Sequence, residues 1–164
     1  MGYTHYFHGL TATPAVIADA RKIIDASRAT VCGPLGQGLP VLGEADGIWL
    51  NGFEAADEDF ETFHLRGTDE PEHPDLSAFC KTAHKPYDVV VTAILISAAV
   101  RSMEDSQVDD IQGSVRSDGK WDNWVAGVEL FEQAVRPLTM DEKIALELDV
   151  ENMRALQRET PGVR

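Results

Sequence analysis

The sequence has few cysteines, few basic residues and no apolar run long enough to cross a membrane. Two cysteines in 164 residues are too few for a disulfide scaffold, so this usage favours a reduced cytosol. The N-terminus shows no basic region followed by an apolar core, and we therefore predict no secretory signal. The most apolar run, residues 89–100, spans twelve residues, whereas a transmembrane helix needs about twenty. These absences predict a cytoplasmic protein with no membrane partner.

The motifs that mark common enzyme and cofactor sites are also missing. The sequence contains no nucleophile elbow, no zincin motif and no dinucleotide fingerprint. The glycine-rich residues 33–47 lack the spacing and the lysine of a phosphate-binding loop. A zinc set of His73, Cys80 and His84 can be drawn, because Cys80 and His84 would share a helix face, but its spacing matches no strong metal pattern. We predict no cofactor and no metal site.

Bases are scarce, and the acids are concentrated in the middle of the chain. The formal net charge is −14, and residues 44–79 hold eleven acids against one base, Arg66, a net charge of −10. Such a field repels nucleic-acid phosphates and anionic lipid headgroups, so we predict no direct binding to nucleic acid or to a membrane surface. A basic protein or a cation would be attracted instead. The alternative is that the acids only keep the surface soluble.

The hydrophobic pattern predicts one α+β domain over residues 1–158 and a frayed tail over 159–164. Its sheet is expected to be small and mostly antiparallel, with a central buried helix and amphipathic helices packed on it. Thr13 and Pro14 predict the first helix start, and Thr139 with Glu142 predicts a capping box for the last helix. The expected elements are a strand at 3–9, a helix at 14–28, a hairpin of 48–51 with 59–65, a buried helix over 89–100, a short strand at 110–115, and helices over 121–135 and 139–158.

Residues 80–88 place reactive side chains immediately before the predicted buried helix. Cys80 could act as a nucleophile if His84 and an acid, Asp88 or Glu61, converge on it. A cysteine beside a phenylalanine is also typical of a core position, and we favour this interpretation of Cys80.

The same segment holds donors in front of a helix N-terminus, where phosphate or carboxylate is attracted. Lys81, Thr82, Lys85 and Tyr87 could therefore bind a small anion. The alternative is that Lys81 and Lys85 pair with the acids of residues 44–79 and tie the hairpin to the helix.

Several segments resemble a widespread set of small uncharacterised proteins of tailed phages and prophages. The matching segments are residues 1–6 (MGYTHY), 51–52 (NG), 61–63 (ETF), 79–82 (FCKT), 85–88 (KPYD) and 117–121 (SDGKW). The resemblance implies a phage or prophage origin and action in the cytoplasm of a bacterial host, but it implies no activity. It draws attention to polar residues of separate segments that the fold could bring together as a binding site: His5, Glu61, Cys80, Lys81, Lys85, Tyr87 and Asp88.

Three functional hypotheses follow. The first is a non-enzymatic accessory protein that binds a host protein, basic in character, or a small anionic ligand, with DNA mimicry as one variant. The second is a small enzyme or a nucleotide- or anion-binding domain that uses residues 80–88. The third is a structural protein of the virion. The sequence predicts no oligomeric state.

Overall fold

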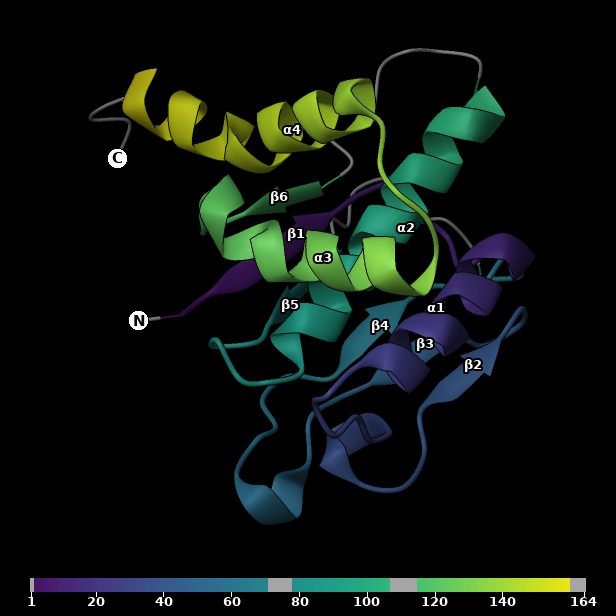
Figure 1. Ribbon diagram of the computed structural model, residues 1–164. Helices are drawn as coiled ribbons and strands as arrows, with labels where there is room; N and C mark the ends of the chain where they lie inside the picture. The colour runs from purple at the N-terminus through teal and green to yellow at the C-terminus, as the bar shows by residue number, and fades with distance from the viewer. Residues whose placement is uncertain (1, 71–77, 107–114, 160–164) are drawn as a thin grey trace.

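The computed structural model describes residues 2–70, 78–106 and 115–159, and it confirms the α+β class. Within these residues the chain forms four α-helices and two three-stranded antiparallel sheets (Figure 1). The predicted tail lies outside the described residues, apart from Glu159. The elements are β1 (Thr4–Phe7), α1 (Pro14–Ala26), β2 (Val41–Gly43), β3 (Gly47–Leu50), β4 (Phe63–Leu65), β5 (Ala78–Lys81), α2 (Asp88–Ser106), β6 (Val115–Ser117), α3 (Val125–Ala134) and α4 (Met140–Glu159).

The first sheet has the strand order β5-β1-β6, with β1 in the centre. The predicted strand at 3–9 is therefore confirmed. Its partner β5 was not predicted: Cys80 lies opposite His5 on a strand, so the expectation that Cys80 and His84 share a helix face is wrong. Ala83 and His84 have φ values of 50° and 59°, and this left-handed conformation ends any regular element. The expected strand at 110–115 meets β6 only at Val115, and its other residues lie outside the described ones.

The second sheet has the order β2-β3-β4. The predicted hairpin is confirmed, because β3 pairs with β4 through Ile48 and Leu65. Its second strand begins at Phe63 rather than at residue 59, since residues 53–61 form a loop between the strands. Strand β2 falls inside the glycine-rich residues 33–47, where no strand was predicted. This strand has three residues and ends in a glycine, so it is too short to show a clear alternation of apolar and polar side chains.

The buried helix α2 organises the core. Residues 90–100 are all buried, which confirms the prediction of a helix enclosed on nearly every side. Helices α1 and α3 pack against it, while α4 lies beside β6 at the upper end of the view in Figure 1. A Cβ on Gly127 of α3 would lie 2.2 Å from Thr92 Oγ1 of α2, so only glycine permits this close approach of the two helices.

The local capping predictions are also confirmed. Thr13 Oγ1 accepts a hydrogen bond from Val16 N at 3.3 Å at the start of α1. Before α4, Glu142 N donates to Thr139 Oγ1 at 3.1 Å and Thr139 N donates to Glu142 Oε1 at 2.9 Å. Both orphan N–H groups of this capping box are thus satisfied reciprocally.

Candidate functional site

Residues 78–88 run along the edge of the first sheet as β5, turn sharply, and enter α2. The seven predicted site residues do meet around this segment, but six of them form two separate hydrogen-bond networks, and Lys85 instead pairs with Asp57. One is a buried chain that contains His5 and Asp88. The other joins Cys80, Lys81 and Tyr87 to the backbone and side chain of Glu61.

The buried chain links three strands or turns to the start of α2. His5 Nε2 lies 2.6 Å from Asp88 Oδ1, and His5 Nδ1 lies 3.1 Å from Ser117 Oγ. Thr82 Oγ1 donates to the same Asp88 oxygen at 2.6 Å, and Gly119 N donates to Ser117 Oγ at 3.1 Å. A neutral His5 that donates through Nε2 and accepts through Nδ1 satisfies every one of these groups. His5, Thr82, Asp88 and Ser117 are all buried.

Aromatic rings enclose this chain. The His5 ring meets Tyr3 edge-on at 4.7 Å and Trp124 edge-on at 5.1 Å, and the exposed His84 stacks on Tyr3 at 3.8 Å. Tyr3 Oη and Trp124 Nε1 are buried and have no hydrogen-bond partner among the residues that the structure describes. Burial is the largest cause that raises the pKa of Tyr3, and the charge of Asp88 raises it further. The nearby side chains of Ser117 and Trp124 lower this pKa in part, although neither forms a hydrogen bond with Tyr3 Oη. The arrangement resembles a serine–histidine–aspartate chain, but its hydroxyl is enclosed by protein.

The second network makes Cys80 a core residue. Its side chain is completely buried, and its Sγ lies 3.6 Å from the carbonyl oxygen of Glu61. Tyr87 Oη donates to that same carbonyl at 2.6 Å, while Lys81 N donates to Glu61 Oε2 at 2.8 Å. Burial, reinforced by the Glu61 charge, raises the pKa of the Cys80 thiol to about 12. At neutral pH the group is a protonated thiol, a weak nucleophile.

The two lysines of the segment reach toward the acidic loop, the name used here for residues 53–61. Lys85 Nζ donates to the carbonyl oxygen of Asp57 at 2.7 Å and lies 3.7 Å from its carboxylate. Lys81 Nζ lies 5.7 Å from the centre of the Phe60 ring, within cation–π range. This is the arrangement expected if the lysines tie the loop to the start of α2.

Asn51 has a structural role that was not predicted from the sequence. Its Oδ1 accepts from Gly52 N at 2.8 Å and from Phe60 N at 3.0 Å. Its Nδ2 donates to Phe60 O at 3.0 Å and to Thr62 Oγ1 at 3.2 Å. The buried amide therefore closes the acidic loop at its base. An Asn–Gly pair directly after an apolar strand was the signal available in the sequence.

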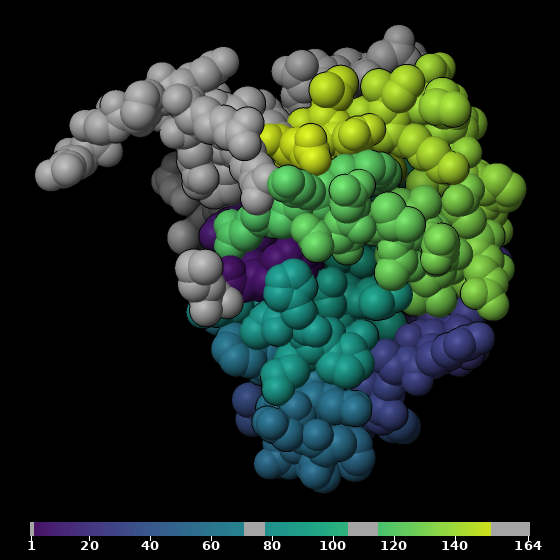
Figure 2. All heavy atoms as spheres, turned by 60° about the vertical axis from the view of Figure 1, so that its left-hand side comes forward, coloured from purple at the N-terminus to yellow at the C-terminus, as the bar shows by residue number. Residues whose placement is uncertain are grey.

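Among the residues that the structure describes, the acids of residues 44–70 fall into two groups at the two ends of β3. The acidic loop carries five acids and no base in nine residues, and Glu54, Asp57 and Glu61 among them are exposed. The turn between β2 and β3, with the adjoining residues 68–70, forms a second group whose exposed members are Glu44, Asp46 and Asp69. In Figure 2 the acidic loop projects at the lower end of the molecule.

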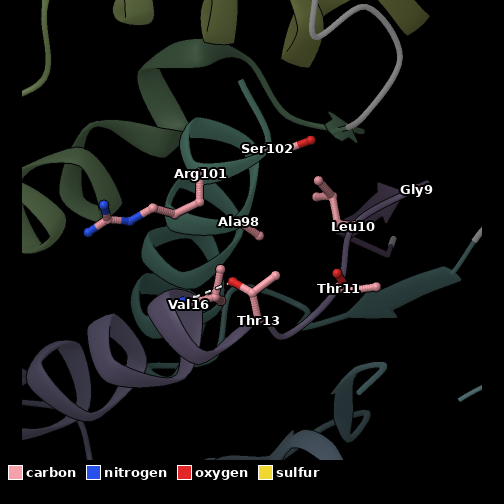
Figure 3. Close-up of a pocket in the computed structure, with 8 residues that line it drawn as sticks. All are labelled: Gly9, Leu10, Thr11, Thr13, Val16, Ala98, Arg101 and Ser102. Carbon is pink, nitrogen blue, oxygen red and sulfur yellow. Dashed lines mark hydrogen bonds between the residues drawn. The ribbon is translucent and has the colours of Figure 1, made fainter. Parts of the chain in front are cut away.

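A pocket of about 320 Å³ lies away from all seven predicted site residues, between the β1–α1 connection and α2 (Figure 3). Its size is at the lower limit of ligand sites. Figure 3 shows Arg101 pointing away from the hollow, and its guanidinium pairs with Asp19 at 3.0 Å. The polar residues of the wall are Thr11, Thr13, Arg101 and Ser102. Because Thr13 Oγ1 already accepts from Val16 N and Arg101 is held by Asp19, the pocket offers little to orient a charged ligand.

Neither metal-ligand clusters, nor membrane-spanning helices, nor similarity to known proteins adds a site within the described part of the chain. Among the residues described, no group of three or more His, Cys, Asp or Glu side chains is placed to hold a metal ion. In the same part of the chain, every helix falls short of the length and apolarity needed to span a bilayer. Comparison of the sequence with models of known families, with curated proteins and with solved structures found no match.

Proposed function

We propose that this protein is a non-enzymatic accessory protein of phage type, acting in the bacterial cytoplasm, that binds a basic protein through its acidic loop. One observation carries the proposal: the loop presents five acids at a projecting end of the molecule, and its base is fixed by Asn51 and Lys85. A fixed loop binds with less loss of conformational entropy than a mobile one.

The electrostatics of the loop favour a cationic partner. The two neighbouring lysines do not neutralise it, because residues 53–61 carry five acids and residues 78–88 supply only Lys81 and Lys85 as bases. A surface of one sign at a projecting end accelerates encounter with a surface of the opposite sign, and the effect falls with ionic strength. Association should therefore weaken strongly with added salt.

The division of the acids into two groups favours a protein-specific surface over general DNA mimicry. A DNA mimic needs carboxylates spaced along one continuous face, whereas β3 separates Glu44 and Asp46 from the acidic loop. The two alternatives that use residues 80–88 receive less support. Lys85 is engaged by Asp57 and Cys80 is enclosed, so neither presents a free reactive group.

The two acid groups provide a matched test. A variant of the acidic loop carries Glu54→Gln, Asp57→Asn and Asp59→Asn, and a variant of the turn carries Glu44→Gln, Asp46→Asn and Asp69→Asn. Both change the net charge by the same amount. Immobilised wild-type protein should retain a basic protein from bacterial lysate at low salt, the turn variant should retain it equally, and the loop variant should lose it.

Purification of the retained protein then allows its affinity to be measured at two salt concentrations. Retention of nucleic acid, retention of no macromolecule, or equal losses in the two variants would each contradict the proposal. The last outcome would mean that net charge alone, and not the acidic loop, governs binding.

A further inference from the structure

We infer that two leucines beside the acidic loop, Leu35 and Leu39, are the apolar anchors of the docking surface, and that the partner offers an apolar face rimmed by lysine or arginine. This inference rests on the proposed function and specifies it. The loop of residues 33–39 that carries the leucines is called the leucine loop below.

The leucine loop presents its apolar side chains to solvent. Leu35 is 75% exposed and Leu39 is 86% exposed, while Phe53 and Phe60 of the acidic loop are 39% and 44% exposed. Single exposed apolar residues are common on protein surfaces, but a group of them amid charges marks an interaction site. Anchors of protein interfaces are apolar side chains that enter a pocket, surrounded by a polar rim.

The backbone of Leu35 is held in an unfavourable conformation. Its φ and ψ are 62° and 15°, a left-handed geometry that is uncommon for a bulky residue. The next residue, Gly36, is also left-handed at φ 78°, and a Cβ there would lie 2.7 Å from Glu54 Cβ. Because the side chain of Leu35 is exposed, its burial contributes little free energy to offset this backbone strain. Strain of this kind is typical of functional positions, where the fold fixes a side chain for a task.

Hydrogen bonds connect the leucine loop to the acidic loop. Leu35 N donates to Thr62 Oγ1 at 3.0 Å, and the same hydroxyl accepts from Asn51 Nδ2 at 3.2 Å. Gly33 N donates to Gly38 O at 3.1 Å and closes the leucine loop on itself. The anchors and the acids therefore share one rigid base, and a partner that contacts one group meets the other.

Charge complementarity decides which occupant this surface suits. A second copy of the chain would bring the same acids against each other, which is unfavourable. A basic protein with an apolar face satisfies both the leucines and the carboxylates. Helix α4 also exposes apolar residues at helical spacing, Met140, Ile144 and Leu148. Nothing in the structure indicates what covers that stripe, and here it supplies the control.

The test uses two defined peptides of about 18 residues, which is long enough to form an amphipathic helix that presents one apolar and one basic face. In the first, leucines occupy one helical face and lysines the other; in the second, every leucine is replaced by serine. We expect the leucine–lysine peptide to bind wild-type protein at least tenfold more tightly than the serine–lysine peptide, measured by fluorescence anisotropy.

Leu35→Gly and Leu39→Ser should each reduce the affinity of the leucine–lysine peptide about tenfold and leave that of the serine–lysine peptide unchanged. The control Ile144→Ser with Leu148→Ser should change both affinities less than twofold. Leu35→Gly relieves the left-handed strain, so we expect its melting temperature to be equal to the wild-type value or up to about 3 °C higher. Loss of binding would then be separated from loss of fold.

The outcomes distinguish the two proposals. If both peptides bind wild-type protein equally, or if the leucine variants bind like wild type, the anchors are refuted while the basic partner stands. If neither peptide binds, both proposals are overturned. If the α4 control alone loses binding, the docking surface lies on α4 and the inference is wrong.

Discussion

His5 Nε2 lies 2.6 Å from Asp88 Oδ1, although the two residues are 83 positions apart in the chain. The contact joins the central strand β1 to the first turn of the buried helix α2. Thr82 donates to the same carboxylate oxygen at 2.6 Å, so two donors depend on one acceptor. This relationship fixes the direction in which α2 leaves the sheet and makes Asp88 a residue of the fold rather than of an open site.

We expect Asp88→Ala to lower the free energy of unfolding by about 3 kcal/mol, because removal of one partner from a buried pair leaves the other without compensation. His5 Nε2 and Thr82 Oγ1 would both lose their acceptor. Urea denaturation measures the change. The control is Asp25→Ala on the exposed side of α1, for which we expect a change within about 0.5 kcal/mol. Equal effects of the two substitutions would show that the buried chain contributes no stability.

Cys80 should be unreactive in the folded protein. Burial raises the pKa of its thiol to about 12, so at pH 8 only about one molecule in ten thousand carries the thiolate. In a Cys32→Ser background, which leaves one thiol, Ellman's reagent should react at least a hundredfold more slowly with native protein than with protein in 8 M urea. A native reaction as fast as the unfolded one would restore Cys80 as a candidate nucleophile.

Local signals in the sequence predicted local structure. The caps at Thr13 and Thr139 involve partners within three residues, and the apolar run before Arg101 identified the buried helix. Strand β5 was missed because four residues give little alternation and its partner β1 lies far away in the chain. Without that strand, Cys80 was placed on a helix.

The candidate site shows the same limit. The sequence selected His5 and Asp88, yet their direct contact depends on a long-range pairing that no spacing reveals. Ser117 lies 112 positions from His5, and in the sequence it stands out only as the first residue of the matching segment 117–121. The strain at Leu35 could not be foreseen, since leucine has no preference for the left-handed region and the surrounding glycines indicate only a loop.

All three tyrosines should ionise abnormally. Burial is the largest cause that raises the pKa of Tyr3, Tyr6 and Tyr87 above the ordinary value of about 10. A group whose pKa is raised in the folded state stabilises the fold below its unfolded pKa, and that contribution is lost as pH rises. We therefore expect stability to fall with increasing pH above about 10.

Absorbance at 295 nm, which reports the tyrosinate ion, checks this directly. The signal of native protein should stay low at pH 10 and rise together with the loss of helical circular dichroism. Protein in guanidinium chloride serves as the control and should titrate with a midpoint near pH 10. A half-maximal tyrosinate signal at pH 10 with native dichroism, equal to that of the unfolded control, would contradict the predicted shifts.

Asn51 should be needed for the acidic loop more than for the rest of the fold. Asn51→Asp keeps the size of the side chain but replaces the Nδ2 donor by an oxygen that faces Phe60 O. The buried, unpaired charge should lower the free energy of unfolding by about 2–3 kcal/mol.

The effect should extend to residues 53–61, because their closure depends on this amide. Hydrogen exchange measures it: the Phe60 amide, which donates to Asn51 Oδ1 at 3.0 Å, should exchange faster relative to the amides of α2. A uniform increase at both places would show that Asn51 supports the whole fold and has no special role in presenting the loop.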